Sequence, residues 1–165
     1  MANTLYIVAG LSDADMIWLL STGSLKRLRG GERPIQAGKP VGDLFFVTQG
    51  SLAVVLPDGT QVATLEEGAV FGEMSFIESR PPSATVRAEG KGEILAIPRD
   101  RILERFEQEP RFAARFYRAL ALFLSERLRE TTATANAPRD ADADAQAAAG
   151  GERFRRALQM LRGKA

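Results

Sequence analysis

The sequence predicts a mainly β domain with flanking helices, and three observations point to this class. Short runs of alternating apolar and polar residues occupy residues 24–98, separated by glycines and one Pro-Asp-Gly turn. Turn signals at intervals of about 8–12 residues are typical of a sandwich or barrel. A capped apolar segment precedes this stretch and a long helical pattern follows it. No strand–helix–strand spacing is visible, so a doubly wound α/β fold is not expected.

A short helix is predicted first, beginning near Asp13. Ser12 or Asp13 can cap its N-terminus, and the apolar residues Met16 to Leu20 follow directly. Gly23 marks its end.

The strands come next. Leu52–Leu56 and Gln61–Leu65 are expected to pair antiparallel, because Pro57-Asp58-Gly59 between them is a turn sequence in which proline presets φ and glycine tolerates positive φ. The other expected strands are Arg33–Gln36, Asp43–Thr48, Ala84–Ala88 and Ile94–Ile97.

Two helices are expected after the strands, a short one from Asp100 to Phe106 and a long one over 111–130 with Pro110 in its first turn. The apolar face of the long helix covers roughly half its circumference, more than the stripe of about 100° that one contact needs. This excess indicates either a second contact, with a ligand, another helix or a second subunit, or close packing on its own domain. The residues of this face are Phe112, Phe116, Ala119, Leu120, Phe123, Leu124 and Leu128.

The composition limits the chemistry. The chain of 165 residues has 22 basic and 21 acidic side chains, and it contains no cysteine and no histidine. Nucleophilic Ser-His and Cys-His pairs, imidazole metal ligands and thiolates are therefore excluded. We expect a binding or regulatory module and not an enzyme. The first ten residues hold no Lys or Arg and no apolar run could span a bilayer, so a cytoplasmic protein without a transmembrane segment is expected.

The end of the chain differs in composition from the rest. Residues 131–151 are rich in Ala, Thr and Asp, and we predict a flexible linker there. Residues 152–165 regain amphipathic spacing, with Phe154, Leu158 and Leu161 on one face and five basic residues beside them. This short basic helix could dock on its own domain, bind a partner protein or an anionic membrane surface, or remain a disordered tail.

Residues 68–86 are the most informative for function. Gly72 precedes what could be one helical turn, Glu73–Phe76, whose free N–H groups suit an anion. Glu73 would repel a phosphate, but it could accept a hydrogen bond from a sugar hydroxyl. A phosphate attached to a ribose would match this glutamate together with the nearby Arg80 and the hydroxyls of Ser83 and Thr85. On spacing alone, a turn between two strands with a capping glycine fits equally well.

This segment resembles the phosphate-binding cassette of the cyclic-nucleotide-binding domain family. The resemblance extends over about residues 11–130, preceded by an N-terminal segment, residues 1–10. It implies a β-roll of jelly-roll type with a short helix in the cassette and helices after the last strand. The residues that match the family pattern are Gly38, Asp43, Leu44, Phe45, Phe46, Gly50, Gly59, Gly68, Phe71, Gly72, Glu73, Ala84, Thr85 and Val86.

The resemblance implies a binding site for cAMP or cGMP and no catalytic residue, metal or further cofactor. Backbone N–H groups near Gly72–Ser75 would bind the cyclic phosphate, Glu73 would accept from the ribose 2′-OH, and Ser83 would touch phosphate or purine. The helix over 111–130 would cover the base. The candidate ligand-binding residues are Phe71, Gly72, Glu73, Met74, Ser75, Arg80, Pro82, Ser83, Ala84 and Thr85.

One position departs from the family pattern. Where the family has the arginine that pairs with the phosphate, this chain has Pro82. Loss of a charge-assisted hydrogen bond costs about 1.5–3 kcal/mol, or roughly tenfold to a hundredfold in affinity. We therefore expect weakened binding with Arg80 as the candidate replacement, or else a degenerate module that acts as a protein-interaction adaptor.

The partners follow from the same resemblance. We expect an unidentified protein partner and a homodimer through the helix over 111–130. Direct DNA binding is not expected, because the 35 residues after Glu130 are too few for a helix-turn-helix domain.

Overall fold

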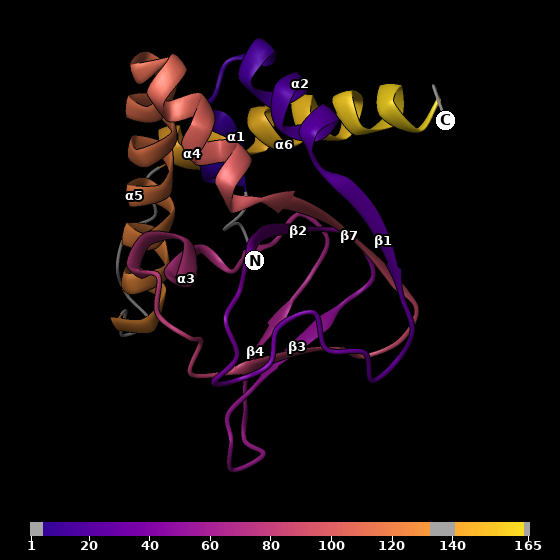
Figure 1. Cartoon of the computed structure of the whole chain (residues 1–165). Coiled ribbons are helices and arrows are strands. Elements are labelled where there is room, and N and C mark those ends of the chain that lie inside the picture. The colour runs from indigo at the N-terminus through magenta and orange to yellow at the C-terminus, as the bar shows by residue number, and fades with distance from the viewer. Residues whose placement is uncertain (1–4, 133–140, 164–165) are drawn as a thin grey trace. The chain divides into compact units, whose positions relative to one another are not determined.

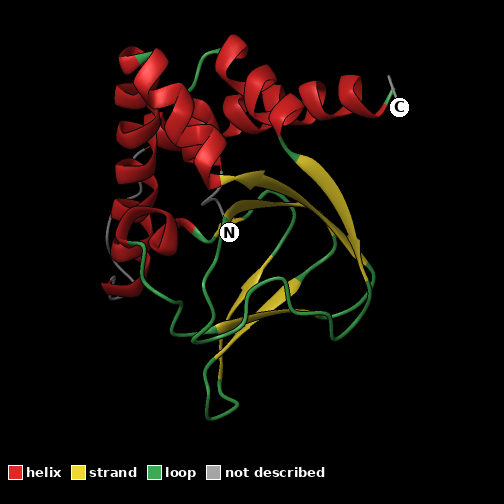
Figure 2. Cartoon of the chain, in the orientation of Figure 1, coloured by secondary structure: helices red, strands yellow, loops and turns green. Residues whose placement is uncertain are grey.

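The computed structural model describes residues 5–132 and 141–163 (Figure 1). The chain forms two compact units. The first, here called the β unit, comprises Thr22–Ile102, and the second, the helical unit, comprises Met1–Ser21 together with Leu103–Ala165. Figure 2 shows that the strands all belong to the β unit and that most of the helices belong to the helical unit.

The β unit contains two antiparallel sheets. One has the strand order β1-β7-β2-β5 and the other the order β4-β3-β6. Antiparallel sheets with flanking helices confirm the predicted fold class. The strands are β1 (Ser24–Leu28), β2 (Asp43–Gln49), β3 (Leu52–Val55), β4 (Gln61–Leu65), β5 (Val70–Phe71), β6 (Thr85–Ala88) and β7 (Gly92–Pro98).

Apolar side chains from both sheets form one core between them. Phe45 of β2 stacks on Phe71 of β5, with ring centroids 4.8 Å apart. Leu52 of β3 and Val86 of β6 reach the same cluster from the other sheet. This shared core joins the two sheets into a single roll, because each sheet buries its apolar face against the other.

The strand predicted over Arg33–Gln36 is wrong. Only one isolated bridge forms there, between Ile35 and Val86. The chain still follows β6 closely, since Gly31 N donates to the Ala88 carbonyl and Ala88 N donates to the Glu32 carbonyl. Pro34 has no N–H to continue a ladder, which explains why this segment stays irregular despite its apolar residue.

The helical unit is built from elements at both ends of the chain. It contains α1 (Leu5–Ala9), most of α2 (Asp13–Thr22), α5 (Pro110–Thr132), α6 (Ala141–Arg162) and the later part of α4 (Arg99–Gln108). The predicted helices near Asp13, over 100–106 and over 111–130 are therefore confirmed, each with slightly longer bounds. No helix among the described residues is both long and apolar enough to cross a membrane.

A buried carboxylate joins the helices of this unit. Asp15 is 1% exposed and accepts two hydrogen bonds from Arg115 of α5, at 2.8 and 3.0 Å. The side chains of Ser12 and Asp15 also accept from each other's backbone N–H, a reciprocal cap of α2. Arg105 of α4 lies 3.6 Å from Asp15, and its guanidinium lies 4.5 Å from the ring centres of both Trp18 and Phe112.

The broad apolar face of α5 is used mainly inside the helical unit. Phe112, Phe116 and Phe123 are each at most 2% exposed, whereas Leu128 near the end of the helix is 64% exposed. Phe112 contacts the rings of Trp18 and Phe106. Packing within the same chain thus accounts for most of this face, and the homodimer remains a prediction.

The linker predicted for residues 131–151 is wrong over its second half, because α6 already begins at Ala141. Residues 133–140 of that segment lie outside the described residues. Alanine has the highest helix propensity, so an alanine-rich stretch extends a helix once its end is packed. That packing is present: α6 contacts α1, and Phe154 and Leu158 are 7% and 5% exposed. Arg153 also binds Asp13 at 2.7 Å and donates to the Leu11 carbonyl.

Candidate functional site

The candidate site is built around α3 (Glu73–Glu78), which follows β5 after a single glycine. Gly72 has φ +84° and caps the helix, so the chain turns sharply between strand and helix. A Cβ at this position would lie 3.0 Å from the Asp43 carbonyl oxygen and 3.3 Å from the Phe45 ring. The positive φ and the close contacts both require glycine.

The start of α3 combines the backbone N–H groups of a first helical turn with the buried side chain of Glu73. Phe76 N donates to the Gly72 carbonyl, which closes the first helical turn. The N–H groups ahead of Phe76 have no partner within the helix itself, as in any helical first turn. Glu73 is 4% exposed. A carboxylate is rarely buried this far without a specific partner, and Glu73 has an interaction within the chain.

Arg99, the first residue of α4, holds the other end of α3. Its Nε donates to the Phe76 carbonyl at 3.2 Å, and its Nη2 donates to the Ser79 hydroxyl at 2.8 Å. Ser79 has φ +55° and is the only non-glycine residue with positive φ in the described part of the chain. Arg99 therefore holds a residue whose backbone conformation is unfavourable for a side chain.

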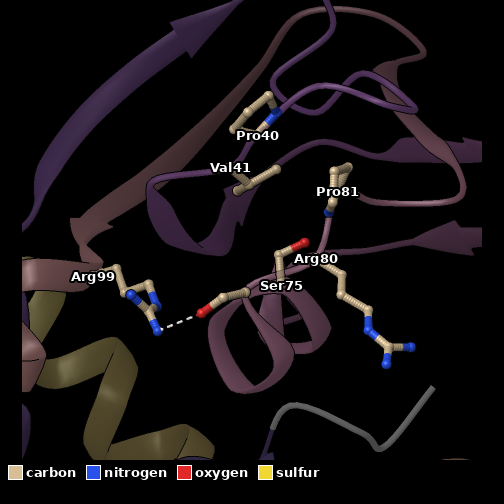
Figure 3. A pocket seen from close by; sticks show the side chains of 7 residues that line it. Pro40, Val41, Ser75, Arg80, Pro81 and Arg99 are labelled. Carbon is tan, nitrogen blue, oxygen red and sulfur yellow. Dashed lines mark hydrogen bonds between the residues drawn. The ribbon is translucent and has the colours of Figure 1, made fainter.

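A pocket of about 140 Å³ opens beside α3. Its polar wall consists of Ser75, Ser79, Arg80 and Arg99. Its apolar wall consists of Pro40, Val41 and Pro81. Figure 3 shows the Ser75 hydroxyl pointing toward the side of Val41 and Pro81, while Arg80 extends away from Arg99. The pocket thus combines two hydroxyls and two guanidinium groups with a small apolar wall.

The rest of the predicted cassette lies on the segment that leads into β6. The Pro82 carbonyl accepts from Gly38 N at 2.8 Å, and the Thr85 hydroxyl accepts from Ala37 N at 3.1 Å. Thr85 therefore has a structural contact, whereas Ser83 is exposed and Ala84 half-buried. Met74 is 59% exposed on the outer side of α3. These two bonds bring the loop at residues 36–42 against the cassette.

Arg80, the candidate replacement for the missing arginine, lines the pocket with a side chain that extends into solvent. Its side chain is 81% exposed and lies 3.8 Å from the Glu78 carboxylate, its neighbour at the end of α3. An ion pair this exposed contributes little energy. The second guanidinium of the wall, that of Arg99, is held in place by its hydrogen bonds to Phe76 and Ser79.

Sequence reasoning missed Arg99 and the wall formed by Pro40 and Val41. Arg99 directly follows β7, and its backbone N–H donates to the Gly42 carbonyl at 2.9 Å. Because Pro98 of β7 pairs with Asp43 of β2, this junction lies next to the loop at residues 36–42. Nothing in the local sequence separates Arg99 from the other arginines of α4, so only strand pairing could find it.

The two packed sheets and the glycine-capped α3 define a domain of the jelly-roll class. The family model "Cyclic nucleotide-binding domain" matches residues 25–109. The chain therefore belongs to the cyclic nucleotide-binding domain family.

The chain is also similar to part of two larger curated proteins. The chain is 36% identical to Glutaminase 1 of Bradyrhizobium diazoefficiens over 123 residues, which is 74% of this chain and 20% of that protein. The chain thus spans about a fifth of the curated relatives it matches first.

Two solved structures share the fold. A cyclic nucleotide-binding domain from Methylobacillus flagellatus has a TM-score of 0.69 at 23% identity, with 78% of each chain covered. The N-terminal domain of a transcriptional regulator from Streptomyces coelicolor has a TM-score of 0.65 at 23% identity, with 81% of this chain and 96% of that chain covered.

Proposed function

We propose that this chain is a regulatory module that binds a cyclic mononucleotide, cAMP or cGMP, at the cassette around α3 and signals its presence to a protein partner. The observation that supports this most directly is the pairing of Gly72 and Glu73. Gly72 has φ +84° at the head of α3, and Glu73 is 4% exposed directly after it.

The chemistry of the two residues is complementary. A glycine at a helix start lets a phosphate approach backbone N–H groups closely, and the helix dipole favours its negative charge. A buried carboxylate beside this place would repel the phosphate, but it is a strong acceptor for a ribose hydroxyl. A nucleotide whose phosphate and sugar are joined in one ring would present both groups over this short distance.

A second function is favoured by one specific observation. Pro82 stands at the position of the family's phosphate-binding arginine, and its carbonyl is already bonded to Gly38 N. Pro82 therefore contacts the loop at residues 36–42 and offers no positive charge to a phosphate. The competing proposal is a module that has lost its nucleotide and acts as a protein-interaction adaptor.

Calorimetric titration of the full chain with cAMP and with cGMP tests the proposal. We expect saturable binding of at least one nucleotide to the wild type. Glu73→Gln should weaken it about tenfold or more, because a charged acceptor is replaced by a neutral one. Glu78→Gln is the matched control on the same helix, where an exposed glutamate is neutralised, and it should change affinity less than about twofold.

The adaptor proposal predicts the opposite pattern. Neither nucleotide would then produce saturable heat with the wild type, and Glu73→Gln would change nothing except stability. Equal losses in Glu73→Gln and Glu78→Gln would also contradict the cassette as the binding site.

A further inference from the structure

We propose that the pocket beside α3 binds a phosphate-type oxyanion, and that Arg99 together with the Ser75 hydroxyl is its receptor. This site is formed by the pocket and Arg99, and it does not involve Pro82, which stands where the family has its phosphate-binding arginine. This inference deepens the proposed function if the oxyanion belongs to a cyclic nucleotide, and it stands separately if the pocket takes free phosphate.

The charge on Arg99 favours an anionic ligand. Its side chain donates to one backbone carbonyl and one hydroxyl, and it lies 5.8 Å from the centre of the Phe76 ring. All of these partners are neutral. Within residues 5–132 and 141–163, Arg99 has no carboxylate partner, although it is half-buried. A guanidinium has further N–H donors in a planar fork that matches an oxyanion.

The Ser75 hydroxyl offers a further hydrogen-bond donor to a ligand in the pocket. Ser75 is 6% exposed and lines the pocket, into which its oxygen points (Figure 3). In the part of the chain that the structure describes, this hydroxyl makes no hydrogen bond to another residue. A hydroxyl withdrawn from bulk water loses free energy unless it finds a partner, so an acceptor in the pocket would satisfy it.

The residues of the pocket wall also favour an anion. The pocket is lined by two arginines, two serines and three apolar residues, and no carboxylate is among them. Glu78, at the end of α3, does not line the pocket and contacts the exposed side chain of Arg80. The pocket therefore offers donors and positive charge without a competing negative group on its wall.

The size of the pocket agrees with one ionic group. A volume of about 140 Å³ is well below the roughly 300–1,000 Å³ of pockets that enclose a whole small molecule. A phosphate group fits such a space, while any sugar or base attached to it would extend outside. Free inorganic phosphate and the phosphate of a nucleotide would satisfy the same donors.

The position of Arg99 suggests what binding would change. An oxyanion that engages the guanidinium competes with the Ser79 hydroxyl for it. Ser79 has a strained backbone, so weakening this hydrogen bond would loosen the end of α3. Since Arg99 is also the first residue of α4, occupancy of the pocket acts directly on the start of that helix.

The test is a set of titrations of the full chain, at constant ionic strength, with inorganic phosphate, cAMP and cGMP as separate probes. Binding is followed by backbone and arginine Nε–H NMR signals, which identify the residues that respond. For the wild type we expect saturable shifts at Ser75, Ser79 and the Arg99 Nε–H with at least one probe. Arg99→Gln should weaken the binding of that probe about tenfold or more, and Ser75→Ala should weaken it about threefold.

Arg87→Gln is the matched control, because it removes the same charge from an exposed position of β6 that does not line the pocket. Its affinity should stay within about twofold of the wild type. Ser75→Ala removes no hydrogen bond of the folded protein, so it keeps the test valid even if Arg99→Gln loosens α3.

The probes separate this inference from the proposed function. Phosphate binding that depends on Arg99, without nucleotide binding, supports the pocket and contradicts the proposed function. Nucleotide binding that is unchanged in Arg99→Gln and Ser75→Ala overturns the pocket and leaves the proposed function intact. Equal losses in Arg87→Gln and Arg99→Gln, or no saturable shift with any probe, also overturn the pocket.

Discussion

Arg99 in the β unit and two arginines in the helical unit have opposite surroundings. In the helical unit, Arg115 and Arg105 both lie against Asp15, so their charges are compensated within the fold. In the β unit, Arg99 donates only to neutral groups beside an open pocket. The comparison indicates that a paired arginine stabilises the structure, whereas an uncompensated one next to a pocket is available to a ligand.

The electrostatics of the Asp15 site agree with a structural role. Burial raises the pKa of the Asp15 carboxyl, but hydrogen bonds from Arg115 and Ser12 outweigh it and keep that pKa below its ordinary value of 3.8. The hydrogen bond to Asp15 likewise raises the pKa of the Arg115 guanidinium. Each group favours the charged form of the other, which is the signature of a stable internal ion pair.

The largest expected effect comes from breaking this ion pair. Asp15→Ala should lower the free energy of unfolding by about 3–4 kcal/mol, because it leaves Arg105 and Arg115 without their shared carboxylate. Urea denaturation followed by Trp18 fluorescence measures it, since Trp18 is the single tryptophan and contacts Phe112 in this unit.

Asp13→Ala provides the control, as its side chain is 79% exposed although it also binds an arginine. That variant should lose less than about 1 kcal/mol. If both aspartates cost the same, burial does not distinguish the two ion pairs and the comparison fails.

The next effect concerns how the helical unit is completed by the end of the chain. Phe154→Ala in α6 should cost about 3 kcal/mol, since a 7% exposed aromatic ring leaves a cavity when it is removed. Met160→Ala on the same helix, where the side chain is 65% exposed, should cost less than about 0.5 kcal/mol. Thermal or urea unfolding of the full chain gives both values. A small effect for Phe154 would mean that α6 adds little to this unit.

The smallest expected effect is on ligand affinity in the β unit. Pro82→Arg should tighten binding of cAMP or cGMP about tenfold, because it adds a charge-assisted hydrogen bond at the family position. Val62→Arg adds the same charge at an exposed position of β4 and should leave affinity within about twofold.

This variant also sharpens the role of Arg99. If Arg99 already supplies the charge, Pro82→Arg should restore binding most strongly in the Arg99→Gln background. An unchanged affinity in both backgrounds would remove the phosphate site from the cassette. Calorimetric titration of the four proteins provides the comparison.

Much of the fold followed from local sequence. Pro57-Asp58-Gly59 predicted the hairpin between β3 and β4, and Ser12 predicted the start of α2, because turn and cap residues act through their own backbone. The apolar spacing predicted α5 because a helix face is periodic. Two local predictions were wrong. Pro34 prevents a regular strand near Ile35, and α6 begins within the predicted linker because its far end is packed on α1.

For the site, the sequence by itself determined the segment: Gly72 before a helical turn, Glu73 as its first residue, and a proline where the family has arginine. Only the tertiary structure decided which arginine is held at the pocket by hydrogen bonds. Arg80 is close in sequence but extends into solvent, whereas Arg99 is distant in sequence and is brought beside Ser79 by the pairing of β2 with β7. The physical reason is that caps and turns depend on neighbouring residues, while a binding pocket depends on contacts between segments that only strand pairing brings together.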